Sequence, residues 1–264
     1  MKLKDKVAVV IGASRRGGSG WCAAELLAAE GAKVFVAARR LDRVRTLTDA
    51  IGGVPLQCDI SVDSEVAAMF STIADQADHV DLAVCASGQG YTDTIAGTDP
   101  ETLMQATAIN YFGPFYFARR AFPLMKPGSS LIYYSTLTAK QVFIGSAPYS
   151  CAKAALNALT KYAALEFAPH GIRVNAIAPG LILSPQANKW AQTGVMPAML
   201  KEIPLGKGVD PRELAQMVLW LATEAKSMTG EIIYVDGGNH LRRAASPDEF
   251  PQEGIEAMNA KRKK

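Results

Sequence analysis

Residues 7–20 have the sequence VAVVIGASRRGGSG, an apolar run that leads directly into a glycine-rich segment. The run Val7–Ile11 is short and continuously apolar, like strands that a parallel sheet buries on both faces. A helical pattern follows near residues 20–30. Glycines between a strand and a helix let backbone N–H groups approach a phosphate at the positive end of the helix. The stretch therefore predicts a nucleotide-binding fold, with a tight structural turn as the alternative.

The same alternation of short apolar runs and longer helical patterns continues along the chain. Further strands are expected near residues 33–37, 56–58, 82–86, 131–135, 173–176 and 232–235. Further helices are expected near residues 64–75, 100–122, 149–167 and 211–222. The alternation predicts a single-domain α/β fold, a doubly wound (Rossmann-type) sheet of about seven parallel strands with helices on both faces. That domain spans residues 1–238, and residues 239–264 form a C-terminal extension.

Composition narrows the class of protein. A chain of 264 residues with 49% hydrophobic and 20% charged residues is typical of a folded globular protein. The net charge of +3 gives no reason to expect a nucleic-acid partner. The four cysteines lack metal-ligand spacing, which predicts no metal site and reduced thiols. No apolar run approaches the length of a signal peptide or a membrane span, so we expect a cytoplasmic protein with no membrane partner.

The second expected strand is followed by Ala38, Arg39 and Arg40. Folds that bind NAD(H) often carry an acidic residue here, which accepts a hydrogen bond from the ribose 2′-hydroxyl. Guanidinium groups suit a 2′-phosphate instead, through charged and forked hydrogen bonds. Arg15 and Arg16 on the glycine-rich segment would add to the same positive field. The pattern favours NADP(H), with NAD(H) or a solvated pair of arginines as alternatives.

The strand expected at residues 131–135 leads into two hydroxyls, Ser135 and Thr136, and Tyr149 and Lys153 open the next long helix. Positions four apart share a helix face, so the phenol and the ammonium should lie side by side. An ammonium about 4 Å away, at an effective dielectric near 20, contributes about 4 kcal/mol. That would lower the pKa of the phenol from about 10 to about 7. The segment predicts a proton-transfer site, although a surface pair with this spacing also arises by chance.

Further short motifs accompany these in a fixed order. The whole set is Gly12…Gly18-x-Gly20, Asp59-Ile60, Asn110-Tyr111-Phe112-Gly113, Tyr149-x-x-x-Lys153, Pro179-Gly180, Thr229-Gly230 and Val235-Asp236-Gly237-Gly238. Over residues 3–238 the chain thereby resembles the classical short-chain dehydrogenase/reductase family. The resemblance implies a homotetrameric oxidoreductase that transfers hydride between a nicotinamide and a carbonyl or alcohol carbon. It favours C=O over C=C chemistry, because related enoyl reductases separate the tyrosine and lysine further.

The resemblance also implies roles for individual residues. Tyr149 would donate the proton, and Thr136, with Ser135 as the alternate, would hydrogen-bond the carbonyl oxygen. Lys153 would bind the nicotinamide ribose and favour the phenolate, and Asn110 would hold a water molecule. The expected cofactor-binding residues are Gly12, Ser14, Arg15, Arg16, Gly18, Ser19, Gly20, Arg39, Arg40, Asp59, Ile60, Ala86, Ser87, Gly88, Lys153, Pro179, Gly180 and Ile182.

Three features depart from the family's usual pattern. The glycine-rich segment carries two extra residues after Gly12. Cys85-Ala86-Ser87-Gly88 stands where the family usually has Asn-Asn-Ala-Gly, so an amide that supports the strand ends is missing. Thr136 occupies the place of the usual catalytic serine, and its hydroxyl offers the same donor and acceptors.

The substrate side is expected in a lid at about residues 184–206. Apolar residues in the lid and before Tyr149 favour an apolar or aromatic ketone or an acyl chain, with packing in the core or against a subunit as the alternative. These residues are Trp190, Met196, Met199, Leu200, Val142, Phe143 and Ile144. The charged end of the extension, Lys261-Arg262-Lys263-Lys264, is expected to be mobile.

The leading hypothesis is an NADP(H)-dependent oxidoreductase that reduces a ketone or 3-oxoacyl group to a secondary alcohol. An NADP⁺-dependent secondary alcohol dehydrogenase would use the same site in the opposite direction. A non-catalytic NADP(H)-binding regulator is the alternative from another class.

Overall fold

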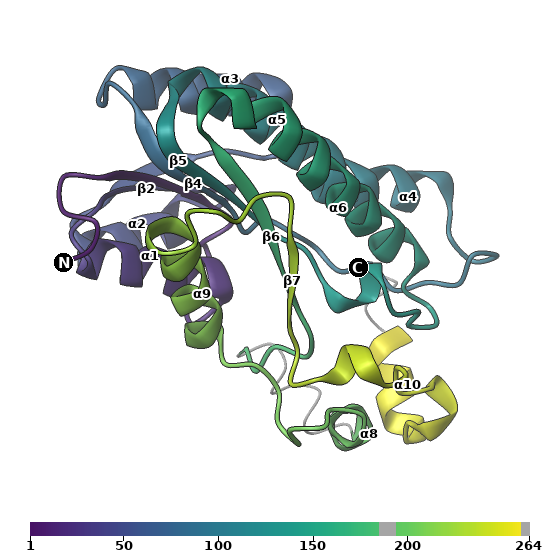
Figure 1. The fold of residues 1–264 in the computed structure, drawn as a ribbon. Helices are drawn as coiled ribbons and strands as arrows, with labels where there is room; N and C mark the ends of the chain where they lie inside the picture. The colour runs from purple at the N-terminus through teal and green to yellow at the C-terminus, as the bar shows by residue number, and fades with distance from the viewer. Residues whose placement is uncertain (185–193, 260–264) are drawn as a thin grey trace.

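The computed structural model describes residues 1–184 and 194–259 and consists of one sheet between two layers of helices (Figure 1). The sheet has seven strands in the order β3-β2-β1-β4-β5-β6-β7, and all neighbours are parallel. The strands are β1 (Val7–Ile11), β2 (Lys33–Ala38), β3 (Val54–Gln57), β4 (Val80–Cys85), β5 (Met125–Tyr134), β6 (Arg173–Pro179) and β7 (Ile232–Val235). The expected doubly wound α/β fold is confirmed.

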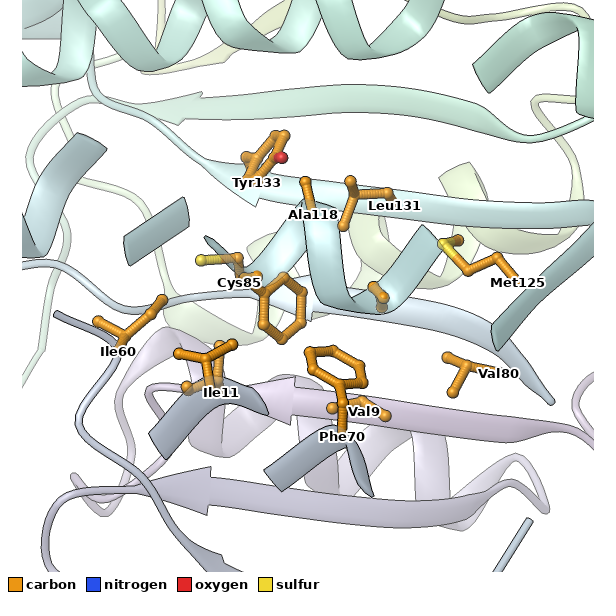
Figure 2. Close-up of a cluster of buried hydrophobic side chains, with 14 of the residues drawn as sticks. Val9, Ile11, Ile60, Phe70, Val80, Cys85, Ala118, Met125, Leu131 and Tyr133 are labelled. Atoms are coloured by element: carbon orange, nitrogen blue, oxygen red, sulfur yellow. The ribbon is translucent and has the colours of Figure 1, made fainter. Parts of the chain in front are cut away.

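Helices α3 (Asp63–Ala74), α5 (Gly113–Ala121) and α6 (Ala147–Phe167) cover one face of the sheet, and α1 (Ser19–Ala29), α2 (Leu41–Ile51) and α9 (Pro211–Thr223) cover the other (Figure 1). Val9 and Ile11 point into the core between the sheet and α3, α5 and α6, with Phe70 and Leu131 (Figure 2). Val10 lies in the core on the opposite face, under α1, α2 and α9. Burial on both faces explains why the strands read as continuous apolar runs rather than alternating ones.

Two differences from the expected elements have local causes. Helix α2 was not anticipated, because its sequence is mostly polar and its buried residues are only Val44, Leu47 and Thr48. Strand β3 lies two residues before its expected start at residue 56, pairing Val54 with Phe35 of β2. It lies at the edge of the sheet, where Pro55 is tolerated because no further strand needs its missing N–H.

The helix expected over residues 100–122 is interrupted by a π-helical turn. Helix α4 (Pro100–Thr107) runs into the turn Ala108–Phe112 and then into α5. Asn110 lies in this turn, fully buried, and its Nδ2 donates to the carbonyl of Ala106 at 2.9 Å. Such turns open the regular helical bonding, here at a residue expected in the site.

The chain continues beyond β7 into ordered structure. Short 3₁₀ turns at Asn239–Leu241 and Pro247–Glu249 precede α10 (Gln252–Asn259), which lies near α8 (Val195–Lys201) in Figure 1. Phe250 is 5% exposed, so this part of the extension is packed rather than a solvated tail. The charged residues 261–264 lie outside the described residues. Within the described part of the chain, every helix falls short of the length or apolar character that crossing a membrane requires.

Candidate active site

The glycine-rich loop meets the loop after β4 where the sheet changes direction. Strand β1 lies between β2 and β4, so the chain crosses from one side of β1 to the other, the usual position of a ligand crevice. Gly12 has φ +95°, and a Cβ there would lie 2.4 Å from the backbone nitrogen of Ser87 and 2.5 Å from the carbonyl carbon of Ala86. A Cβ on Gly20 would lie 2.9 Å from the Gly12 oxygen. Both positions require glycine because backbone packs directly against them.

The two extra residues form a compact turn rather than a disordered insertion. The N–H of Gly18 donates to the Arg15 carbonyl at 2.9 Å, and Gly17 adopts φ +67°. Helix α1 then begins at Ser19, with Gly18 as a cap that supplies no side-chain hydrogen bond. The first N–H groups of the helix therefore have no side-chain cap at Gly18, an arrangement suited to a phosphate.

A positive cluster lies beside this loop, at the end of β2. Arg40 donates from Nη2 to the hydroxyl of Ser14 at 3.0 Å. Desolvation and the neighbouring charge of Arg40 lower the pKa of Arg15, so the two guanidinium groups are close. Arg16 is exposed, and Arg39 pairs instead with Asp59, at 3.9 Å between Nη1 and Oδ2. Arg40 thus contacts the glycine-rich segment, near Arg15, whereas Arg39 pairs with the loop after β3.

The loop after β3 borders a cavity of about 300 Å³. Asp59 accepts hydrogen bonds from the backbone N–H and hydroxyl of Ser61, which fix its carboxylate, while Ile60 is buried. Desolvation and Asp59 raise the pKa of Tyr91, against the opposing effect of Arg39. The cavity is lined by Arg39, Ser61, Gln89, Tyr91, Gln105, Ala108 and Ile109. Its position beside Asp59 fits the base of a dinucleotide, and Gln89 and Tyr91 are lining residues that no sequence motif identified.

Lys153 lies at the centre of the site and is 2% exposed. Its Nζ donates to the backbone carbonyl of Tyr134, the last residue of β5, at 2.7 Å. A Cβ on Gly88 would lie 3.3 Å from this Nζ and 3.3 Å from Oδ1 of Asn110, so a side chain at position 88 would crowd both. Burial lowers the pKa of Lys153 to about 8, partly offset by Cys85. The helix α6 and the loop after β4 thus bring three expected site residues together.

Asn110 fastens that loop to the π-helical turn. Its Nδ2 donates to the carbonyl oxygen of Gln89 at 3.0 Å, and its Oδ1 accepts from the Gln89 N–H at 3.2 Å. With the bond to Ala106, both amide hydrogens have protein acceptors. Oδ1 faces Gly88 and keeps acceptor capacity. Asn110 therefore ties the loop after β4 to the π-helical turn.

Tyr149 is in the first turn of α6, one helical turn before Lys153, and Thr136 lies close enough to its phenol to influence the pKa of Tyr149. Burial raises the pKa of Tyr149 and the Thr136 hydrogen bond lowers it, with a net rise. The expected lowering by an ammonium about 4 Å away is therefore wrong for this state, because the Lys153 ammonium is directed to the Tyr134 carbonyl. The two residues share a helix face, as expected.

The two candidate hydroxyls have different partners. Ser135 donates from Oγ to Oδ1 of Asn157, further along α6, at 2.5 Å. Thr136 accepts a hydrogen bond from the N–H of Thr138 at 3.3 Å and contacts Tyr149. Ser135 therefore anchors the strand end to α6, while Thr136 lies beside the phenol. Asn157 had no sequence signal, since its spacing from Tyr149 belongs to no motif.

The end of β6 forms the opposite wall. The N–H of Gly180 donates to the Val235 carbonyl at 3.1 Å, and a Cβ there would lie 2.8 Å from that of Asp236. Pro179 ends β6, and Ile182 forms a bridge with Val209. On the other side, the N–H of Ala86 donates to the Ile11 carbonyl at 2.9 Å. Close backbone contacts thus fix both sides of the crevice.

The expected lid is partly described. Helix α8 carries Met196, Met199 and Leu200, which pack on Leu181 and Ile203. Trp190 lies outside the described residues. Of the apolar residues before Tyr149, Val142 and Ile144 are exposed, whereas Phe143 packs against the C-terminal extension. The packing of α8 and Phe143 agrees with the alternative of core packing, and the lid stays a prediction.

Comparison with known proteins identifies the family. A family model described as "Enoyl-(Acyl carrier protein) reductase" matches residues 12–240. The chain belongs to the short-chain dehydrogenase/reductase family. It is 31% identical over 240 residues to carbonyl reductase family member 4 of Xenopus laevis, covering 90% of this chain and 99% of that protein. It is 29% identical to a 3-oxoacyl-[acyl-carrier-protein] reductase of Rattus norvegicus, with the same coverage.

Among solved structures, an actinorhodin polyketide ketoreductase with NADPH superposes with a TM-score of 0.83. It is 25% identical and the match covers 91% of this chain and 98% of that chain. This short-chain dehydrogenase/reductase is therefore an oxidoreductase. Within residues 1–184 and 194–259, no group of three or more His, Cys, Asp or Glu side chains is arranged to hold a metal ion.

Proposed function

We propose that this enzyme uses NADPH to reduce a ketone or 3-oxoacyl group to a secondary alcohol. The observation that carries the proposal is the position of Tyr149, near Thr136 and one helical turn before buried Lys153, at the crevice of a nucleotide-binding sheet. A phenol and a second hydroxyl in contact can share one carbonyl oxygen between them. The similar carbonyl reductase and 3-oxoacyl reductase support the same class of substrate.

The chain's own groups then divide the work. The nicotinamide, when bound, supplies the hydride. Thr136 hydrogen-bonds the carbonyl oxygen and fixes its place, and Tyr149 donates its proton to that oxygen as charge develops there. A phenol is protonated at neutral pH, as a proton donor in the reductive direction must be. Lys153, buried at the crevice, would bind the nicotinamide ribose. Asn110 retains an acceptor for a water at Oδ1.

The preference for NADPH rests on the positive cluster. Arg15 and Arg40 lie together beside Ser14 at the end of β2, and Ala38 occupies the place where an acid would bind a 2′-hydroxyl. Two guanidinium groups and a hydroxyl match the donors that a 2′-phosphate requires. The similar ketoreductase whose structure contains NADPH supports the same choice.

The enzyme is proposed to be a homotetramer. Large apolar side chains that do not belong to the candidate site are exposed along α4, α5 and α6. They are Leu103, Met104, Phe115, Tyr162 and Leu165. Burying such a surface between copies would stabilise association. Light scattering coupled to size exclusion measures the mass directly, and a monomer would contradict the proposal.

The test of function is NADPH oxidation over a panel of aliphatic, aromatic and 3-oxoacyl ketones. Tyr149→Phe should lower kcat/KM by about 10³-fold and leave NADPH binding nearly unchanged, because only the proton donor is removed. Tyr162→Phe is the matched control, since it removes the same hydroxyl from a tyrosine of the same helix far along from the site and keeps the apolar ring. Near-normal turnover by Tyr149→Phe would overturn the assignment of Tyr149. Cofactor binding without turnover of any ketone or alcohol would instead indicate a regulator.

A further inference from the structure

The C-terminal strap, residues 239–251, joins the two segments that flank the candidate substrate side. One is the loop between Thr136 and Tyr149, whose ends carry both proton-handling hydroxyls. The other is the region of α8, which follows Gly180 in the chain. No contact of the proposed reaction explains why the chain should continue past β7 to reach both.

The strap holds the catalytic loop through hydrogen bonds and an aromatic contact. Gln141 donates from Nε2 to the carbonyl of Asn239 at 3.0 Å and to that of Arg242 at 2.7 Å. The rings of Phe143 and Phe250 have their centroids 6.3 Å apart. The loop is thus fastened at two positions between Thr136 and Tyr149.

The same strap is fastened to α8 and its flanks. Asn239 donates from Nδ2 to the Glu202 carbonyl at 2.8 Å, and Arg242 donates to the Lys201 carbonyl at 3.0 Å. Arg243 pairs with Glu202 at 2.9 Å and with Glu249 at 2.7 Å. Ion pairs at such exposed positions contribute little by themselves, so the strap depends mainly on its buried contacts.

Those buried contacts form a small separate core. Val195 of α8, Ala245 and Phe250 are 1%, 4% and 5% exposed, and Phe143 and Met199 pack around them. Met199 also belongs to the cluster on Leu181, directly after Gly180. One continuous apolar wall therefore runs from Leu181 through Met199 and Phe143 to Phe250.

We propose that Phe250 is a specificity-determining residue, which limits the size of the carbonyl substituent that fits against this wall. This inference rests on the proposed reductase function. Phe143 and Met199 pack against the cluster that contains Phe250, and removal of its ring would let both retreat. A larger substituent would then be accepted, while the hydride and proton geometry for a small ketone would be retained.

The experiment compares kcat/KM for a bulky aryl ketone with that for a small methyl ketone. Phe250→Ala should raise the ratio of bulky to small about tenfold, a change typical of altered apolar pocket volume. Phe250→Leu should give a smaller rise, and the Kd for NADPH should stay constant in both. Leu241→Ala is the control, since Leu241 is on the same strap but 76% exposed. A ratio within about twofold of the parent value in folded Phe250→Ala, or equal loss for both ketones, overturns the proposal.

Two further measurements keep the test decisive. If Phe250→Ala does not fold, Phe250→Leu alone decides, and an unchanged ratio overturns the proposal. If the parent enzyme reduces no ketone, the proposed function fails while the strap can still be examined. Amide hydrogen exchange of the loop 137–146 should then be faster in Phe250→Leu than in Leu241→Ala, and equal exchange would show that the strap does not hold the loop.

Discussion

The two sides of the crevice are built in different ways. On the cofactor side, backbone packs on backbone: Gly12 against Ser87, Gly20 against Gly12, and the turn at Gly18 closed by one hydrogen bond to Arg15. On the substrate side, side chains bind segments that are distant in the sequence. For example, the Gln141 side chain donates a hydrogen bond to the carbonyl of Asn239, 98 residues away. The first arrangement depends on residue type at single positions and tolerates almost no change. The second depends on volume and can be altered to accept another substrate.

Lys153 lies where the two sides meet, and its replacement should have the largest effect. Lys153→Met removes the ammonium that would bind the ribose in the proposed function, so kcat/KM should fall about 10³-fold and NADPH affinity should fall as well. The matched control is Lys161→Met, an exposed lysine of the same helix. Steady-state kinetics and fluorescence titration of NADPH measure the two effects. Unchanged affinity would remove the ribose role.

The same residue predicts a pH dependence. Burial lowers the pKa of Lys153 to about 8, so the free enzyme loses this proton as pH rises through 8, and NADPH binding should weaken above that pH. Stability follows the opposite sign. Below pH 8 the burial of the charged Lys153 lowers the free energy of unfolding by about 3 kcal/mol. This cost disappears as pH rises from 8 toward the pKa of the unfolded state. Lys153→Met should therefore lack the binding inflection and melt no lower than the parent protein. A lower melting temperature at pH 7 would show that the charge is stabilised.

Gly12→Ala tests the cofactor side alone. A Cβ at 2.4 Å from the Ser87 nitrogen must push two loops apart, and we expect the Kd for NADPH to rise about 100-fold, equivalent to roughly 3 kcal/mol. Gly52→Ala is the control, because Gly52 also has positive φ, +67°, but would meet nothing within 4 Å. It should cost about 1 kcal/mol of stability and leave binding unchanged. Equal binding by both variants would contradict the backbone-packing account.

Arg40→Ala distinguishes the dinucleotides within the cofactor side. The loss of one charged hydrogen bond at an exposed position should weaken NADPH about tenfold while NADH binding stays the same. Arg45→Ala, on the exposed face of α2, serves as the control. Isothermal titration with each cofactor gives the ratio. Parallel losses for NADPH and NADH would place Arg40 outside the 2′-phosphate site.

The sequence predicted the two sides of the crevice unequally well. Continuous apolar runs predicted all seven strands, although β3 and β4 begin two residues and β5 begins six residues before the expected starts, because pairing with neighbouring strands decides where each strand begins. The glycine-rich motif identified Gly12 and Gly20, where close backbone contacts leave no room for a side chain. The polar helix α2 and the lining residue Tyr91 were missed, since neither carries a periodic or motif signal. The packing of residues 239–251 onto the domain was not predicted, because their few apolar residues are spaced irregularly.

The sequence by itself determined the nucleotide-binding sheet, the family motifs and the helix that places Tyr149 one turn before Lys153. Those features are local, because strand burial, glycine conformations and helix spacing depend on neighbouring residues. Only the tertiary structure decided that Thr136 rather than Ser135 meets Tyr149, that Lys153 is directed to the Tyr134 carbonyl, and that Phe250 packs on Phe143. Each of these contacts joins segments that only folding brings together. Their spacing along the chain therefore does not predict which residues meet.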